Sequence, residues 1–282
     1  MNMIKKIKIV TDSTADLPVS LLNEYNISII PLKVIFKDNI YREGVDITTK
    51  EFYEKLLNSE QLPMTSQPSP GEFQELYEEL TQDGSTVISI HISAKMSGTC
   101  QSAVLAKNSL PDRDIRVIDS EQVTMSLGLI VLAAAKAAKE NNTADEIEAL
   151  AYEVSKRVKL FFIVDTLDNL QKGGRIGKAS ALIGTVLNIK PILTVEDGIV
   201  TPYEKIRGKS KAIERIVGIL KEYDNNNKLK FCVILHANAL DEAVSLHERV
   251  ITQINPHENI ISDIGAVVGT HAGAGTIGVV FY

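Results

Sequence analysis

The chain has 282 residues, with 30 Lys and Arg against 36 Asp and Glu (a net charge of −6), and 44% of its residues are hydrophobic. This length favours two domains, and the hydrophobic fraction excludes a disordered chain. The acidic balance argues against nucleic-acid binding, which needs clustered Lys and Arg. Two cysteines, Cys100 and Cys232, are too few for a disulfide framework or a metal-binding motif.

The N-terminus is basic but lacks the apolar core of a signal peptide. The longest apolar stretch, residues 127–135, is too short to cross a bilayer. We therefore expect a cytoplasmic protein.

The first half of the chain alternates strands and helices. Three capping boxes, at Thr48, Ser69 and Thr143, indicate helix starts. We expect strands or apolar runs at 8–10, 27–36, 85–93 and 115–118, and helices at 18–25, 48–57, 69–80, 100–110, 123–140 and 143–157. Strands separated by helices pair in parallel through right-handed crossovers.

The pattern changes near residue 160. Apolar runs on both sides of Asp197-Gly198 predict a β-hairpin, because this dipeptide favours a two-residue turn. The other elements expected here are strands at 160–164 and 231–236, helices at 210–223 and 241–254, and two final strands around 269–273. The predicted fold is therefore α/β, with a parallel-sheet α/β domain (1–159) and an α+β domain (160–282).

The segment Ser97-Gly98-Thr99 joins a predicted strand to a predicted helix. The first N–H groups of a helix lack intrahelical partners and lie at the positive end of its dipole, and Gly98 would permit close approach. These features predict a site for a small anionic head group. Other hydroxyl-rich turns should lie at the same edge of the sheet, so Ser13 and Asp119 are secondary candidates; helix capping is the alternative explanation for both.

An extended connector precedes the helix that begins at Ser69. Prolines at 68 and 70 bias the residues before them towards extended conformations. The connector can thus present Thr65 and Ser66 to a neighbouring site, or it is an ordinary surface linker.

The sequence contains no complete nucleotide-binding or catalytic motif of a familiar kind. The sequence Gly273–Gly278 matches G-x-G-x-x-G, but only four residues follow it, so the helix and second strand of a dinucleotide site are missing. Neither Gly208-Lys209-Ser210 nor Gly177-Lys178 completes a P-loop. The histidines show no zinc-binding spacing, and there is no nucleophile elbow. We expect no metal site and no cofactor.

Several short motifs occur in order along nearly the whole chain. They are Thr11–Ser13, Thr65–Ser69, Ser97–Ala103, Gly173–Ile176, Lys190-Pro191 and His271–Gly275. Together they resemble the DegV family. The resemblance implies a bacterial lipid-binding protein of phospholipid metabolism, with a two-domain α/β fold and a long-chain fatty acid between the domains. It further implies that Thr65, Ser97 and His271 meet the carboxylate, and that a separate fatty acid kinase catalytic subunit phosphorylates it. A lipid cargo also leaves room for transient membrane contact.

The physical chemistry of a fatty acid agrees with this reading. Each buried CH₂ contributes roughly 0.8 kcal/mol, so the tail alone can hold the ligand. Neutral donors at the head group leave a carboxylate oxygen free to attack phosphorus, whereas a buried Arg ion pair would trap it. His271 can donate as a neutral imidazole. Its alternative is a histidine satisfied inside a glycine-rich strand. A predicted apolar helix at 178–187 and the stretch 189–193 are candidate tunnel walls.

Two arginines in predicted exposed turns, Arg175 and Arg207, are candidates for docking the kinase, because guanidinium groups bind carboxylates or phosphates bidentately. A solvated loop arginine is the alternative for Arg175.

Two other functions of the protein stay open. One is a transferase or phosphatase with Ser97 as nucleophile and His271 as base. The other is a regulator whose partner contacts respond to lipid occupancy.

Overall fold

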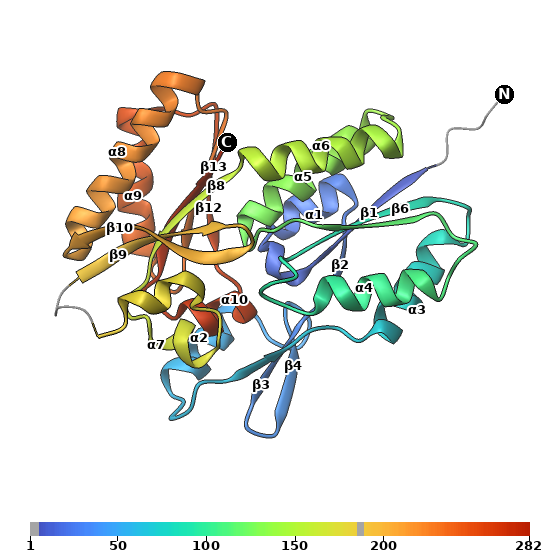
Figure 1. Ribbon diagram of the computed structural model, residues 1–282, viewed down its shortest axis with the longest axis horizontal. Helices are drawn as coiled ribbons and strands as arrows, with labels where there is room; N and C mark the ends of the chain where they lie inside the picture. The colour runs from blue at the N-terminus through green and yellow to red at the C-terminus, as the bar shows by residue number, and fades with distance from the viewer. Residues whose placement is uncertain (1–5, 185–188) are drawn as a thin grey trace.

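The computed structural model describes residues 6–184 and 189–282. It has a mixed α/β fold of two lobes side by side, drawn in blue to green and in yellow to red in Figure 1. Among the described residues, none of the helices has the length and apolar character that crossing a bilayer requires.

The first lobe contains a parallel sheet, as predicted, with strand order β2-β1-β6-β7. Its strands are β1 (Ile7–Asp12), β2 (Ser28–Ile30), β6 (Thr86–His91) and β7 (Ile115–Asp119). Side chains alternate between the two faces of each strand. Val10 and Val87 therefore pack against one helix layer, and Ile9 and Ile88 against the other.

Helices cover both faces of this sheet. One face packs against α3 (Pro70–Thr81) and α4 (Thr99–Asn108), and the other against α5 (Met125–Lys139), which is flanked by α1 (Val19–Tyr25) and α6 (Ala144–Arg157). The three predicted capping boxes are confirmed at the starts of α2 (Thr49–Leu57), α3 and α6.

The apolar run at 27–36 does not form one element. It divides between β2 and β3 (Lys33–Phe36), which belong to different sheets. With β4 (Asn39–Arg42) and β5 (Met64–Ser66), β3 forms a small antiparallel sheet that the sequence pattern did not predict.

The register of this small sheet determines where the connector points. Val34 pairs with Thr65, and Ile35 pairs with Met64. Paired residues share a face of the sheet. Because Val34 is fully buried while Met64 is 65% exposed, Thr65 lies on the inward face.

The second lobe contains a six-stranded, mostly antiparallel sheet with the order β10-β9-β8-β13-β11-β12. Its strands are β8 (Lys159–Ile163), β9 (Ile189–Glu196), β10 (Ile199–Arg207), β11 (Phe231–His236), β12 (Glu258–Asp263) and β13 (Ile277–Phe281). The hairpin predicted at Asp197-Gly198 is confirmed, with φ of 50° and 73° at these residues.

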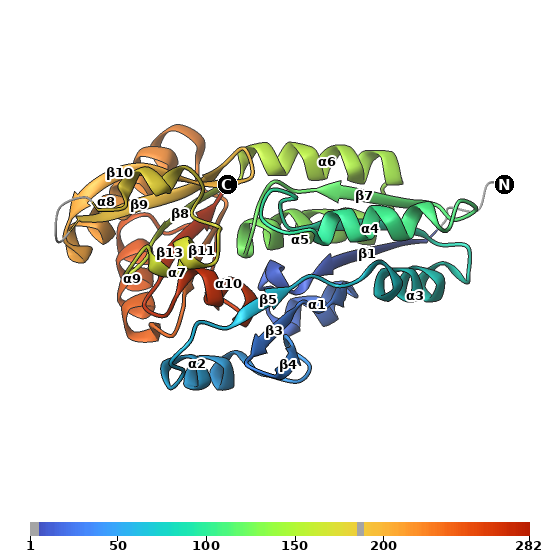
Figure 2. The same cartoon turned by 60° about the horizontal axis from the view of Figure 1, so that its bottom comes forward.

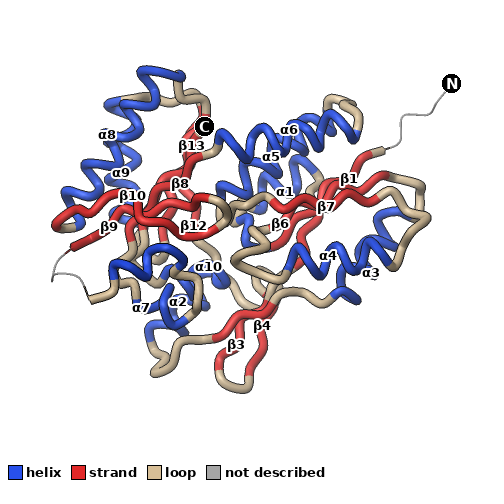
Figure 3. Tube along the Cα trace, viewed as in Figure 1, coloured by secondary structure: helices blue, strands red, loops and turns tan. Residues whose placement is uncertain are grey.

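The two faces of this sheet have different roles. Phe161 and Ile163 pack beneath α8 (Lys209–Asn227) and α9 (Leu240–Gln253), which cover the outer face in Figure 3. Leu160 and Phe162 alternate with them and join the large core shared with the first lobe. The inner face of the sheet is therefore directed towards the junction between the lobes.

Residues 266–272 form the short helix α10 (Ala266–Ala272), so His271 lies in a helix and the alternative of a glycine-rich strand is wrong. Figure 2 shows α10 beside β5 between the lobes. The predicted helix at 178–187 is also only partly correct. After α7 (Asp168–Lys172), the chain forms a 3₁₀ helix, η2 (Gly177–Leu182), and residues 185–187 lie outside the described residues.

Two carboxylates hold the start of α10. Asp16 follows the 3₁₀ helix η1 (Ser13–Ala15) and accepts the N–H of Gly265 at 3.0 Å, and Glu43 accepts that of Val267 at 2.8 Å. A side chain at Gly265 would lie within 2.6 Å of both carboxylates. Burial and the nearby Glu43 raise the pKa of Asp16 well above its usual value, and burial also raises the pKa of Glu43.

These raised pKa values predict a pH-dependent stability. The folded state binds protons at these groups more tightly than the unfolded chain, so the stabilisation is complete below the unfolded pKa and is lost as pH rises through the folded values. Glu43→Gln keeps an acceptor for Val267 but removes one ionisation. Between pH 5 and 8 the variant should lose less free energy of unfolding than the parent protein. Urea denaturation across this range measures the difference. Glu79→Gln, an exposed change on α3, is the control, and parallel slopes in all three proteins would contradict the assignment.

Candidate functional site

A largely apolar cavity lies at the junction of the lobes, with an empty volume of about 820 Å³ including the solvent space at its opening. Its lining comprises Leu32, Thr65, Ser66, Gln67, Ile92, Met96, Ser97, Val123, Thr124, Leu160, Phe162, Leu170, Arg175, Val195, Val200, Leu235, Ile264, Val267, Val268, His271, Ala272 and Thr276. Within the described part of the chain, the lining contains no Asp or Glu.

The cavity has a polar end and an apolar end. Thr65, Ser97 and His271 are partly exposed, so solvent reaches the polar end. Leu160 and Leu235, on the inner face of the six-stranded sheet, are only 3% and 1% exposed. The lining thus combines partly exposed polar side chains with buried aliphatic ones, which suits a ligand with a polar head and an apolar tail.

The three residues predicted to meet a carboxylate all line this cavity. Thr65 and His271 are 206 residues apart in sequence, yet Thr65 Oγ1 and His271 Nε2 form a 2.9 Å hydrogen bond. Thr65 comes from the inward face of the small sheet, and His271 comes from the last turn of α10. The position of this pair therefore depends on both elements.

The double glycine after α7 has two separate tasks. Gly174 has φ of +71° and allows the Schellman end of the helix, in which Arg175 N–H donates to Leu170 O and Gly174 N–H donates to Gln171 O. Gly173 provides space instead, because a Cβ there would lie 2.1 Å from His271 Nδ1. The motif thus shapes a helix end and leaves room for the imidazole.

His271 is a neutral imidazole at physiological pH. Burial, reinforced by the positive charge of Arg175, lowers its pKa to about 4. Its Nδ1 is buried and has no hydrogen-bond partner among the described residues. Only Nε2 is engaged, and whether it donates to Thr65 or accepts from Thr65 depends on the tautomer.

Ser97 lies in the turn that connects β6 to α4. Met96 and Ser97 N–H groups donate to Ser93 O, and Ser97 Oγ is 2.9 Å from Thr99 Oγ1. Gly98 is the N-cap of α4, and a Cβ there would lie 2.8 Å from Gln67 Nε2. Gly98 has an ordinary φ of −73°, so its small size matters here rather than its backbone freedom. Gly98 and the buried Thr99 support Ser97 but are not among the lining residues.

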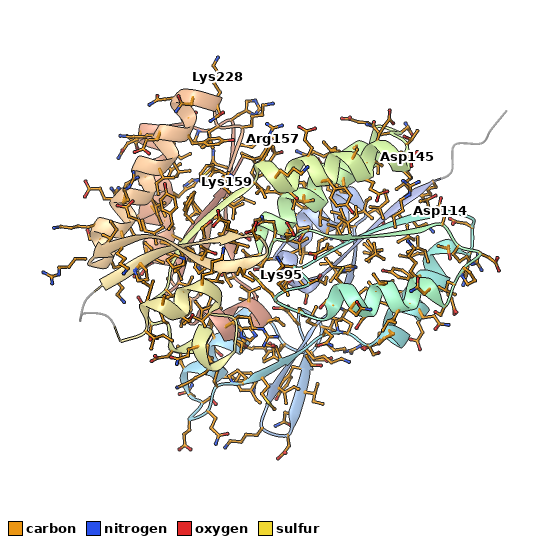
Figure 4. All side chains as sticks on the ribbon, viewed as in Figure 1. Lys95, Asp114, Asp145, Arg157, Lys159 and Lys228 are labelled. Carbon is orange, nitrogen blue, oxygen red and sulfur yellow. The ribbon has the colours of Figure 1, made fainter. Side chains whose placement is uncertain are left out.

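The second lobe contacts this turn through two hydrogen bonds. Ser93 Oγ donates to Gly198 O at 2.8 Å, and Lys95 Nζ donates to Asp197 O at 2.7 Å. Figure 4 shows Lys95 between the lobes, beside the tip of the β9–β10 hairpin. Val195 and Val200 of the same hairpin line the cavity, so the hairpin both contacts the Ser97 turn and forms part of the wall.

Arg175 is not a solvated loop residue. It is partly buried and lines the cavity, with Nε donating to Met96 O at 2.9 Å and Nη1 donating to Gly173 O at 2.7 Å. A positive charge therefore lies near Thr65, Ser97 and His271, where the sequence predicted uncharged donors alone. Arg207 is exposed at the end of β10.

The secondary candidates have different positions. Ser66 lines the cavity next to Thr65. Ser13 Oγ instead accepts the N–H of Leu32, and Asp119 accepts the N–H groups of Ala94 and Glu121. Ser13 and Asp119 therefore brace loops outside the lining.

The geometry does not assemble a Ser–His catalytic pair at Ser97. Among the described residues, Ser97 Oγ has its contacts with Thr99, and His271 Nε2 is bonded to Thr65. A serine–histidine–aspartate chain does exist at Ser89, His91 and Asp12, with distances of 2.7 and 2.9 Å. All three residues are fully buried, so this chain supports the sheet and is out of reach of a substrate.

Sequence reasoning missed three polar lining residues: Gln67, Thr124 and Thr276. Thr124 has φ of 52°, which is rare for a β-branched residue, and its hydroxyl donates to Asp16 Oδ2 at 2.6 Å. Of these three residues, Gln67 alone could have been found from the sequence, because it belongs to the predicted connector.

The predicted walls at 178–187 and 189–193 contribute no described residue to the lining. Residues 6–184 and 189–282 contain no group of three or more His, Cys, Asp or Glu side chains that could hold a metal ion.

Solved structures share this fold over nearly the full chain. A fatty-acid-binding DegV family protein from Thermus thermophilus has a TM-score of 0.92 and 35% identity, covering 98% of this chain and 99% of its own. DegV from Bacillus subtilis, a fatty acid binding protein, has a TM-score of 0.91 and 39% identity with the same coverage. A stearic-acid-binding protein from Eubacterium ventriosum has a TM-score of 0.89 and 28% identity, covering 98% of both chains.

The family model described as "Uncharacterised protein, DegV family" matches residues 6–282. This match extends over both lobes and includes every residue of the cavity. The chain belongs to the DegV family.

Proposed function

We propose that this protein binds a long-chain fatty acid in the cavity between its lobes, with the carboxylate at Thr65, Ser97 and His271. The observation that carries the proposal is a single cavity whose lining joins the partly exposed donors Thr65, Ser97 and His271 to buried aliphatic side chains. The family relatives that bind fatty acids, stearic acid among them, support the ligand class.

The tail supplies most of the affinity. Each CH₂ removed from water contributes roughly 0.8 kcal/mol, before the loss of translational and conformational freedom is subtracted. The aliphatic lining from both lobes provides the surface for this transfer. The head group then needs only hydrogen bonds to fix its position.

The Thr65–His271 hydrogen bond prepares one of these donors. If His271 Nε2–H donates to Thr65 Oγ1, the threonine hydroxyl proton is free to point at a carboxylate oxygen. The opposite tautomer would consume that proton. A bound carboxylate therefore favours the Nε2–H tautomer of a neutral histidine.

We further propose that the chain presents the carboxylate to a separate fatty acid kinase. A carboxylate oxygen would attack the γ-phosphorus of ATP on the kinase, forming an acyl-phosphate O–P bond while ADP leaves. Arg175 holds Met96 O and Gly173 O with two of its nitrogens, so its charge lies near the head group without being committed to a buried carboxylate of the protein. The exposed Arg207 is a candidate contact for the kinase surface.

Removing two hydroxyl donors should weaken binding. Hydrogen bonds to charged groups contribute about 1.5–3 kcal/mol each, so Thr65→Val with Ser97→Ala should lower oleate affinity at least about 100-fold. Isothermal titration calorimetry on delipidated protein measures the change. Thr252→Val removes an exposed hydroxyl on α9 and is the control. Equal affinities for all three proteins would exclude the proposed head-group site.

The histidine should not titrate between pH 5.5 and 8. With the pKa of His271 lowered to about 4, the unfolded chain binds the proton more tightly, so this group adds stability as pH rises from about 4 to 6.5 and nothing further above that. ¹⁵N NMR of the ring nitrogens should report a neutral imidazole throughout pH 5.5–8. A midpoint near 6.5 would contradict the buried, neutral assignment.

The two arginines should separate binding from presentation. Arg207→Ala should leave fatty acid affinity unchanged and slow acyl-phosphate formation when kinase and ATP are supplied. Arg175→Ala should also weaken fatty acid binding, because it removes the hydrogen bond to Met96 O beside Ser97. A normal phosphorylation rate in Arg207→Ala, measured at saturating fatty acid, would remove Arg207 from the docking surface.

A further inference from the structure

A second hollow lies where the lobes join, on the side of the molecule that carries the end of α8. It is lined by Lys156, Arg157, Lys159, Tyr223, Asn227, Lys228, Lys230 and Tyr282. It has an empty volume of about 660 Å³, counted with the solvent at its opening, and shares no residue with the fatty acid cavity. Figure 4 shows Arg157, Lys159 and Lys228 on this side of the two lobes.

This lining has five cationic side chains and no carboxylate side chain among the described residues, in a chain whose net charge is −6. Only Arg157 has an ion-pair partner in the described structure, the exposed Glu153 at 3.0 Å. The four lysines have no carboxylate within 4.0 Å there. Like charges gathered in one hollow repel each other, and an anion would remove this repulsion.

Helix ends explain only part of the cluster. Lys156 and Arg157 lie in the last turn of α6, and Lys228 is the C-cap of α8, where cations interact favourably with the helix dipole. Lys159 begins β8 and Lys230 precedes β11, so no helix end accounts for them. Lys228 also has φ of 56°, a conformation that favours glycine, and yet carries a charged side chain.

The charges also indicate where an anion would lie. A neighbouring cavity shares Lys156 and Lys159 but is also lined by Glu121, Glu196 and Asp197, which would repel an anion. The side facing Lys228 and Lys230 has instead the neutral side chains of Asn227, Tyr223 and Tyr282. Glu258, whose charge adds to burial in raising the pKa of the Tyr282 phenol, lies outside the lining. Ammonium groups bind phosphate as point charges from several directions, and an amide or phenol adds hydrogen bonds.

We propose that this hollow is a second ligand site, which binds the phosphate group of an anionic ligand between the last turn of α6 and the segment after α8. The ligand is either the head group of an anionic phospholipid or a free phosphate compound. The site is independent of the fatty acid assignment, because the two linings are separate. Since α6 belongs to one lobe and α8 to the other, the bound phosphate links the lobes.

The test compares Lys159→Gln/Lys230→Gln with Lys211→Gln/Lys221→Gln. The second pair changes net charge equally but lies on α8 outside the hollow. One arm titrates full-length protein with inorganic phosphate, followed by ¹H–¹⁵N NMR. The other measures co-sedimentation with vesicles of phosphatidylglycerol and phosphatidylcholine, with pure phosphatidylcholine vesicles as the blank.

The parent protein should bind at least one probe, more weakly as salt rises. The hollow variant should bind at least ten-fold more weakly, and the control variant within two-fold of the parent. Binding in the phosphate arm alone identifies a free phosphate ligand, and binding to vesicles identifies a head group. No binding of either probe, or equal losses in both variants, would overturn the proposal. The hollow variant should unfold at the same temperature as the parent or higher, since like-charge repulsion is relieved. If the hollow variant unfolds at a lower temperature, the single substitution Lys228→Gln takes its place in the same binding comparison.

Discussion

The candidate site depends on one hydrogen bond, between Thr65 Oγ1 and His271 Nε2. It connects a three-residue strand near the N-terminus to a two-turn helix near the C-terminus, and neither element would be placed without its surroundings. The register of β3 with β5 directs Thr65 inward. Asp16 and Glu43 hold the start of α10, and Gly173 leaves space for the ring. The polar end of the cavity is thus a product of tertiary structure.

A neutral histidine and a cationic arginine lie side by side at this hydrogen bond. Burial and Arg175 keep His271 neutral, while Arg175 spends two of its nitrogens on backbone oxygens. A carboxylate entering the cavity would therefore meet hydroxyl and imidazole donors and a nearby positive charge that already has partners. Such an arrangement attracts an acid without a bidentate ion pair that would neutralise both of its oxygens.

Local sequence signals predicted the parts of the fold that local physics determines. The capping boxes at Thr48, Ser69 and Thr143 satisfy the first N–H groups of their helices within four residues, and Asp197-Gly198 suits its turn regardless of what surrounds it. The small antiparallel sheet was missed because its strands have three or four residues and no clear alternation. Helix α10 was missed because Gly269 and the β-branched residues Val267, Val268 and Thr270 give its sequence little helix propensity. Its starting N–H groups are satisfied by Asp16 and Glu43, more than 200 residues earlier in the chain.

The site residues divide in the same way. Ser97 was found from a strand-to-helix turn, Thr65 from an extended connector together with a family resemblance, and His271 from the resemblance alone. The interior position of Arg175 was not predicted, because nothing near the Gly-Gly pair in sequence reveals that Met96 O lies within reach. Thr124 was likewise hidden, since its unusual backbone is visible only beside Asp16.

The contact between the hairpin tip and the Ser93–Lys95 turn uses only main-chain oxygens on the hairpin side. Such oxygens are present whatever amino acid occupies the position, so replacing Asp197 would leave both acceptors available as long as the turn persists. Gly198 has no such latitude, because a Cβ there would lie 2.4 Å from Ser93 Oγ. Of these two adjacent residues at the lobe boundary, Asp197 can therefore be replaced by any residue that keeps the turn, whereas Gly198 cannot accept a side chain.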